Sequence, residues 1–263
     1  MPMNKVVHAA QRAAFSAAID AAINAVRGKG PEHMAEQAVK LVNLAQPLLA
    51  HRYPDADWDK VRSFVSDPNS KWMEYAYKAI NEIDPHILKM NTLNLVYEGM
   101  FAGYNYVMEL RKKYDCNMPW ILLFDPTSAC NLHCTGCWAA EYGNRLNLTF
   151  DEIDSIVTQG KQLGVYMYIY TGGEPLVRKK DLIAICNKHS DCQFLSFTNG
   201  TLIDEEFADE MLRVKNFIPA ISLEGFEAAT DGRRGNGVFE KATHAMKLLQ
   251  AKHLPFGISA CYT

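Results

Sequence analysis

The second half of the chain alternates short apolar runs with longer amphipathic stretches, and this alternation constrains the fold more than any other feature. Five runs of six to nine residues are rich in β-branched and aromatic residues, and their length favours strands. They are WILLFD (120–125), VYMYIYT (165–171), QFLSFT (193–198), FIPAIS (217–222) and PFGISACYT (255–263). The stretches between them carry apolar residues on one helical stripe. Strands that alternate with helices in this way predict a parallel sheet built from βα units.

The first half has a different pattern, in which apolar positions recur at helical spacing. Turn-forming residues interrupt this pattern, and they separate the predicted helices. The interruptions fall at residues 28–31, 55–57, 67–68 and 84–85. We therefore predict an all-helical N-terminal domain over residues 1–118, followed by an α/β domain over residues 119–263.

Composition and charge exclude several classes of function. With 27 Lys and Arg against 30 Asp and Glu, the net charge is −3, so we do not expect a nucleic-acid partner. No uncharged apolar run reaches the roughly 18–20 residues of a transmembrane segment, and the N-terminus lacks the order of a secretory signal. The seven cysteines are an odd number, which favours metal ligation or burial in a reducing compartment over disulfides. We therefore expect a cytoplasmic protein.

Three of the cysteines, Cys130, Cys134 and Cys137, lie within eight positions directly after the first predicted strand. Thiols this close together indicate metal ligation, and two kinds of site remain open. A zinc site would need a fourth ligand, for which His133 is the local candidate. An iron–sulfur cluster held by three thiolates would instead leave one iron free for chemistry. The isolated Cys116, Cys186, Cys192 and Cys261 are expected to be small buried hydrophobes without a chemical role.

Further motifs follow the next three predicted strands: TGGEP (171–175), TNG (198–200) and SLEG (222–225). Together with the cysteine spacing, and in this order, they resemble the radical S-adenosylmethionine (SAM) enzymes over roughly residues 119–263. The resemblance implies a partial parallel (βα) barrel. Because this chain supplies five of the six strands usual in that family, we expect the barrel to be truncated at its C-terminus. One position departs from the family pattern: Gly136 stands where many members carry an aromatic residue, and Trp138 follows the third cysteine instead.

The resemblance also implies the cofactors and the reaction. In the family, three cysteines hold a [4Fe–4S] cluster, and SAM chelates the fourth iron through its amino and carboxylate groups. An electron from a donor such as flavodoxin or ferredoxin then allows SAM to be split, and the resulting 5′-deoxyadenosyl radical abstracts a substrate hydrogen atom. The chain is therefore expected to be an enzyme with an iron–sulfur cluster and SAM as cofactors. RGNGVFE (234–240) resembles a pattern of SPASM-type maturases, which implies a peptide or protein substrate, or else a tetrapyrrole.

The TGGEP motif is implied to seat the amino group of SAM. Gly172 and Gly173 let the backbone approach a ligand closely, whereas Glu174 offers a carboxylate and Pro175 stiffens the turn.

The later motifs are implied to bind the rest of SAM. Ser222 and Glu224 lie two residues apart, so we expect them on one face of a strand, where they accept the ribose hydroxyls. Asn199 either reaches the same nucleoside or caps its own loop. Arg234, with Arg233 beside it, is expected to meet the carboxylate of SAM.

Two other classes of protein stay open at this point. The chain is alternatively a non-catalytic iron–sulfur carrier, which would hold a cluster without using SAM, or an interaction module stabilised by zinc. A test for the cluster and for SAM cleavage separates all three.

Overall fold

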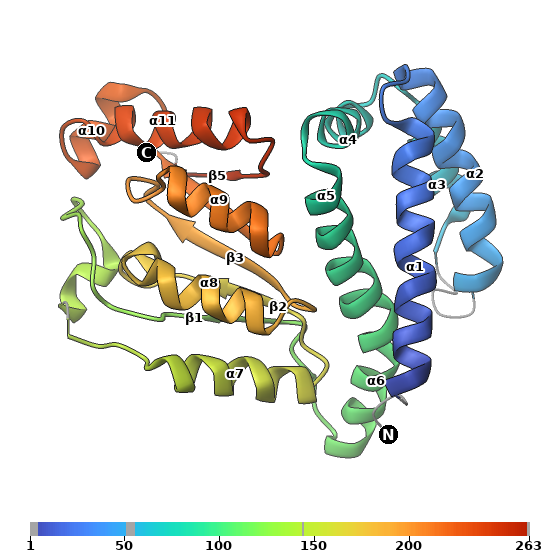
Figure 1. The fold of residues 1–263 in the computed structure, drawn as a ribbon, viewed down its shortest axis with the longest axis horizontal. Coiled ribbons are helices and arrows are strands. Elements are labelled where there is room, and N and C mark those ends of the chain that lie inside the picture. Colours follow the sequence, from blue (N-terminus) through green and yellow to red (C-terminus); the bar gives the residue numbers. More distant parts are fainter. Residues whose placement is uncertain (1–4, 51–55, 144, 262–263) are drawn as a thin grey trace.

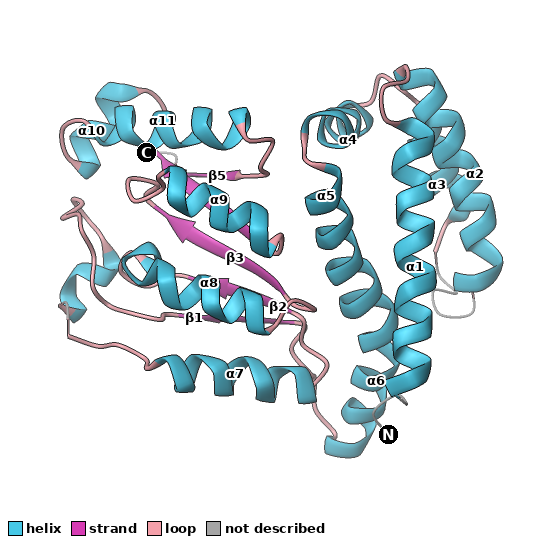
Figure 2. Ribbon diagram, viewed as in Figure 1, coloured by secondary structure: helices cyan, strands magenta, loops and turns pink. Residues whose placement is uncertain are grey.

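The computed structural model describes residues 5–50, 56–143 and 145–261. Figure 1 shows two parts side by side: helices formed by the first part of the chain, and a sheet with its own helices formed by the second. Figure 2 shows that the strands are confined to the second part. The predicted α/β architecture with a helical N-terminal segment is therefore confirmed, whereas the boundary at residue 118 stays a prediction.

The first part is built of helices. In chain order they are α1 (Lys5–Val26), α2 (Pro31–Leu49), α3 (Trp58–Ser66), α4 (Lys71–Glu82), α5 (Pro85–Thr92), η1 (Leu93–Ala102) and α6 (Gly103–Tyr114). Capping side chains mark the starts of α3, α4 and α5. Asp57 accepts a hydrogen bond from the backbone N–H of Lys60, and Asp84 accepts one from that of His86. These aspartates satisfy N–H groups that a helix leaves unpaired at its start, so the predicted breaks mark helix starts.

The last three of these segments, α5, η1 and α6, follow one another without a loop (Figure 1). The central segment η1 is a π-helix, which has a wider turn than an α-helix and which no sequence pattern above predicts. Within the described residues, no helix combines the length and the apolar character that crossing a bilayer requires.

The second part contains one parallel sheet with the strand order β1-β2-β3-β4-β5. Its strands are β1 (Ile121–Phe124), β2 (Met167–Tyr170), β3 (Gln193–Thr198), β4 (Phe217–Leu223) and β5 (Gly257–Ala260). Each overlaps one of the five predicted runs, β3 coincides with its run, and β4 extends one residue beyond its own. The last two residues of the fifth run, 262–263, lie outside the described residues.

The two faces of the sheet differ in burial. One face packs under helices and places Tyr168, Tyr170 and Phe194 in the hydrophobic core. The helices that contribute to this core are α7 (Phe150–Gln162), α8 (Lys179–Lys188), α9 (Glu205–Val214) and α11 (Val238–Ala251). On the other face, Leu123 and Phe197 are 57% and 37% exposed. The sheet is thus a partial barrel whose inner face remains accessible.

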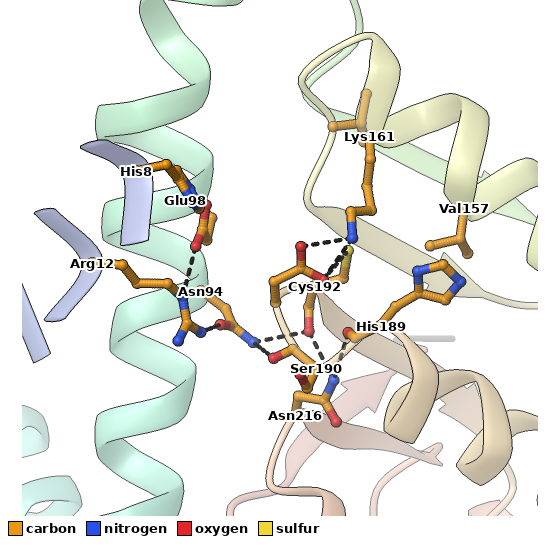
Figure 3. Close-up of polar contacts among 12 residues, drawn as sticks. His8, Arg12, Asn94, Glu98, Val157, Lys161, His189, Ser190, Cys192 and Asn216 are labelled. Carbon is orange, nitrogen blue, oxygen red and sulfur yellow. Dashed lines mark hydrogen bonds and ion pairs between the residues drawn. The ribbon is translucent and has the colours of Figure 1, made fainter. Parts of the chain in front are cut away.

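Buried polar side chains of η1 join the helical part to the sheet (Figure 3). Asn94 donates to the carbonyl oxygens of Ser190 at 3.0 Å and Cys192 at 2.9 Å, just before β3 begins. Glu98, which is fully buried, accepts a hydrogen bond from Nε of Arg12 on α1 at 2.7 Å. These contacts fix the helical part near the amino ends of the strands.

Candidate functional site

The three clustered cysteines lie on the loop that follows β1, near the carboxyl ends of the strands. Cys130, Cys134 and Cys137 are each half-buried and line one pocket of about 340 Å³. The pocket also brings together most of the residues singled out for SAM, namely Gly172, Gly173, Glu174, Asn199, Ser222 and Arg234. Segments up to about 100 residues apart in the chain therefore meet around the thiols.

The cysteine loop, residues 128–137, is held from both sides. On one side the backbone N–H of Glu174 donates to the carbonyl oxygen of Ala129 at 2.8 Å. On the other, the N–H of Thr135 donates to the carbonyl oxygen of Arg233 at 2.8 Å, and Nε of Arg233 donates back to the carbonyl oxygen of Thr135 at 3.3 Å. Arg233 lies in the last turn of helix α10 (Glu227–Arg234), so this helix holds the loop by two hydrogen bonds.

The paired glycines of TGGEP allow this loop to approach. A Cβ on Gly172, which has φ +108°, would lie 2.6 Å from the carbonyl oxygen of Thr127. A Cβ on Gly173 would collide with the backbone carbonyls of Ser128 and Ala129. The close approach in the structure is therefore to the cysteine loop, and side chains here would push that loop away.

Glu174 is buried and firmly held. Its carboxylate accepts hydrogen bonds from the N–H of Leu176 at 2.9 Å, the hydroxyl of Thr198 at 2.7 Å and the N–H of Asn199 at 2.7 Å. Burial raises the pKa of Glu174, although these hydrogen bonds oppose the shift. Pro175, also buried, begins the short helix η3 (Pro175–Arg178) that Glu174 caps, and it does not line the pocket.

Asn199 caps its own loop. Its side-chain oxygen accepts from the N–H and the hydroxyl of Thr201 at 2.9 and 2.7 Å, and its side-chain amide donates to the oxygen of Asn131 at 2.9 Å. Of the two roles that the sequence left open, the structure thus provides the capping contact. It also ties this turn to the cysteine loop, and neither Asn131 nor Thr198 was singled out from the sequence. Only the fold reveals the Asn131 contact, because 68 residues separate the partners.

Glu224 lies just past the end of β4 and is bound by two arginines. Arg234 donates to both of its oxygens at 2.7 Å, and Arg233 donates at 2.5 Å. Burial opposes ionisation of Glu224, but the hydrogen bonds from Arg234 and Arg233 outweigh it and lower the pKa of the carboxyl group. Ser222 lines the pocket, whereas Glu224 does not and instead binds the two arginines. The groups that line the pocket here are therefore the hydroxyl of Ser222 and the guanidinium of Arg234, which Glu224 holds in place.

The thiols fit a cluster ligand set. Burial raises the pKa of Cys130 and Cys134, and at Cys134 the charge of Arg234 opposes this shift and favours the thiolate. His133 is exposed, and the described ranges contain no group of three or more His, Cys, Asp or Glu side chains placed to hold a single metal ion. Thiolates are the usual ligands of iron–sulfur clusters, and a cluster held by three of them keeps one vertex open.

The four isolated cysteines divide into two pairs. Cys186 and Cys192 are buried as expected, and burial strongly raises the pKa of both thiols, so they are poor ligands. Cys116 and Cys261 are exposed, which corrects the expectation of burial. Both lie close to an end of a regular element, after α6 and after β5, where few side chains pack over them.

A second pocket, of about 520 Å³, adjoins the first. Trp138, Gly172 and Gly173 line both pockets. The ring of Trp138 meets that of Tyr142 edge to face, with centroids 5.9 Å apart, on the short helix η2 (Trp138–Tyr142). The aromatic side chain that follows Cys137 therefore borders both spaces, while Gly136 is exposed on the loop.

Comparisons with known proteins agree with this arrangement. Residues 124–262 match the sequence profile of the Radical SAM superfamily. The chain is 30% identical over 149 residues to AdoMet-dependent heme synthase of Methanosarcina barkeri, covering 54% of this chain and 42% of that protein. It is 31% identical over 136 residues to mycofactocin maturase MftC of Mycolicibacterium smegmatis, covering 50% and 34%. Native anSMEcpe with bound AdoMet is 27% identical with a TM-score of 0.46, covering 53% and 43%.

These matches span less than half the length of each relative. The profile match, residues 124–262, contains the strands β2 to β5, the cysteine loop and the TGGEP motif. Because the profile match extends over more than half of the sequence, the chain belongs to the radical SAM superfamily, whose cofactors are a [4Fe–4S] cluster and SAM.

Proposed function

We propose that this chain is a radical SAM enzyme in which Cys130, Cys134 and Cys137 hold the cluster and the adjoining residues bind SAM. The observation that supports it most directly is that the three thiols share one pocket with the TGGEP loop and Arg234. Thiolates suit iron, and carboxylate and guanidinium groups suit the amino and carboxylate groups of an amino acid.

The residues of the pocket would bind and orient SAM. When bound, the reduced cluster supplies the electron that splits SAM into methionine and a 5′-deoxyadenosyl radical. Glu174 is already fixed by three hydrogen bonds, so it can receive an ammonium group with little further ordering. Glu224 fixes Arg234 in the same way, which presents a guanidinium to a carboxylate. The hydroxyl of Ser222 is available to a ribose.

We further propose that the substrate is a peptide or protein, and that flavodoxin or ferredoxin supplies the electron in the cytoplasm. The RGNGVFE pattern (234–240) and the relative named mycofactocin maturase support a substrate of the kind that maturases modify. A tetrapyrrole is the second candidate, because two relatives in Methanosarcina barkeri are named AdoMet-dependent heme synthase and Fe-coproporphyrin III synthase. None of the described cysteines forms a disulfide, which accords with a reducing compartment.

Anaerobic reconstitution with iron and sulfide tests the proposal. We expect about four iron atoms per chain, the absorption of an iron–sulfur cluster, and 5′-deoxyadenosine after addition of SAM and dithionite. Cys134→Ala should lose the cluster and the nucleoside. Cys186→Ala is the matched control, because Cys186 is buried in the core on α8, and it should keep both.

The other outcomes identify the alternatives. A cluster without 5′-deoxyadenosine would make the chain a carrier. Stoichiometric zinc without cluster absorption would make it a zinc-stabilised module. Equal losses in Cys134→Ala and Cys186→Ala would contradict the assignment of the cysteine ligands.

A further inference from the structure

The pocket of about 520 Å³ beside the cysteine pocket has no part in the binding of the cofactors proposed above. Gly172 and Gly173 form a wall between the two spaces, and Trp138 stands at both. A molecule in the second pocket would therefore lie next to SAM. The volume falls within the range of sites for small ligands, about 300–1,000 Å³.

Two opposite charges line this pocket without partners. Within the described residues, neither Asp125 nor Arg145 forms an ion pair or a hydrogen bond through its side chain. Asp125 directly follows β1, and partial burial of its carboxyl group raises the pKa although the residue as a whole stays exposed. By contrast, Glu174 and Glu224 in the neighbouring pocket are held by several donors. Asp125 and Arg145 are both exposed, so a ligand can reach them, and an acid and a base in one hollow suit a ligand that carries both charges.

The same pocket offers an exposed aromatic surface. Trp138 and Tyr142 are 59% and 55% exposed, although side chains of this size are usually more buried. Their edge-to-face contact fixes both rings, which therefore offer a surface of low conformational cost. Aromatic faces bind the methylene stems and the cationic groups of Lys and Arg side chains.

We propose that this pocket binds the substrate, and that the substrate is a peptide segment with a basic and an acidic group close together. The basic group would face Asp125, the acidic group would face Arg145, and the aliphatic stem would lie on Trp138 and Tyr142. A tetrapyrrole with several carboxylates would meet a single cation here and would be repelled by Asp125. This inference rests on the proposed function, since it makes the ligand of the second pocket the substrate.

Binding of defined peptides to the full chain, reconstituted and mixed with SAM under anaerobic conditions, tests the proposal. The probe is a capped lysyl-glycyl-glutamyl tripeptide, compared with analogues that carry norleucine for lysine or glutamine for glutamate. Wild type should prefer the charged tripeptide over each analogue by about fivefold. Asp125→Asn should abolish only the preference for lysine over norleucine. Arg145→Gln should abolish only the preference for glutamate over glutamine.

Controls and contrary outcomes are equally specific. Glu240→Gln and Lys241→Gln change exposed charges on α11 and should leave both preferences intact. The proposal is overturned if no probe binds, if wild type shows no preference, or if both pocket variants weaken all three probes equally. It is also overturned if coproporphyrin III binds through Arg145 and more tightly to Asp125→Asn.

The cofactor test separates this inference from the proposed function. A chain that forms 5′-deoxyadenosine but lacks charge preference retains the proposed function and loses only the substrate assignment. A chain that binds the tripeptide as expected but forms no nucleoside has the recognition site without the chemistry.

Discussion

Two buried glutamates at opposite ends of the strands have similar partners in different surroundings. Glu98, near the amino ends, pairs with Arg12, and Glu224, past the carboxyl end of β4, pairs with Arg233 and Arg234. Both glutamate side chains are at most 2% exposed.

The surroundings give the two pairs different roles. Figure 3 shows that Arg12 also reaches Asn94, whose amide donates to backbone carbonyl oxygens of the sheet part. That pair joins two parts of the molecule. Arg234, by contrast, lines a hollow that contains three thiols. A buried ion pair that is surrounded by packed protein thus stabilises the structure. A similar pair that borders a pocket also offers its charge to a ligand in that pocket.

The largest effect on folding is expected from removing Glu98. Glu98→Ala leaves Arg12 without its partner and opens a cavity, so we expect the free energy of unfolding to fall by about 3 kcal/mol. Urea unfolding of the iron-free chain measures the change. The exposed Glu240→Ala should stay within about 0.5 kcal/mol of wild type, and iron content per folded Glu98→Ala chain should match wild type. A selective loss of iron would mean that the two ends of the strands are coupled.

The next effect acts on the cysteine end. Gly173→Ala forces a Cβ against the carbonyls of Ser128 and Ala129, so we expect about 1–3 kcal/mol of destabilisation and weaker iron retention. Gly232→Ala is the matched control, because a Cβ on this helical glycine meets open space, and alanine there should stabilise by about 0.5–1 kcal/mol. The rate of iron release to a chelator measures the weaker iron retention expected of Gly173→Ala. Equal retention in both variants would show that the loop tolerates displacement.

Two glutamates at the cysteine end should respond to pH in opposite directions. The pKa of Glu224 is lowered from 4.5, so its stabilisation is present above that value and is lost as the pH falls through the folded-state pKa. The pKa of Glu174 is raised, so its contribution is largest below 4.5 and declines as the pH rises through the folded-state pKa. The deficit of Glu224→Gln should therefore shrink on acidification, and that of Glu174→Gln should shrink as the pH rises. Denaturant midpoints of the iron-free chain between pH 4 and 7 test this, and parallel slopes would refute it.

The smallest change in the free energy of unfolding is expected from an ion pair that stays hydrated, close to the contact between η1 and the sheet part. Lys161 and Asp191 pair at 2.6 Å with about 30% of each side chain exposed. Asp191→Asn should cost at most about 1 kcal/mol, and less at high salt. Thermal or urea unfolding at two salt concentrations measures it. A loss of stability as large as that of Glu98→Ala would mean that Asp191 takes part in holding the helical part to the sheet part.

Local patterns predicted the strands and the order of the motifs, because each depends on a few consecutive residues. QFLSFT became β3 without adjustment, and the cysteines, TGGEP and TNG met at one end of the sheet because parallel strands align their carboxyl ends. The contacts between distant segments were not predictable in the same way. Nothing near Glu224 in the sequence indicates that two arginines nine and ten residues later would engage both its oxygens.

Other features escaped prediction for different physical reasons. The π-helix η1 contains Asn94 and Glu98, whose hydrogen-bond partners lie on distant segments, so no local helical pattern predicts these contacts. The exposure of Cys116 and Cys261 reflects how little of the chain covers the ends of α6 and β5. In the sequence, Cys116 and Cys261 are isolated cysteines like Cys186, so nothing there distinguishes the exposed thiols from the buried one.

The two hydrogen bonds between Thr135 and Arg233 affect when the cysteine loop can form during synthesis. The two residues are 98 positions apart, so at about 5–20 residues per second a ribosome needs roughly 5–20 s to make the second after the first. Until Arg233 has been made, the loop that carries the three thiols lacks one of its two anchors. Insertion of iron and sulfide is therefore expected to follow synthesis of α10, because only then is the cysteine loop held from both sides.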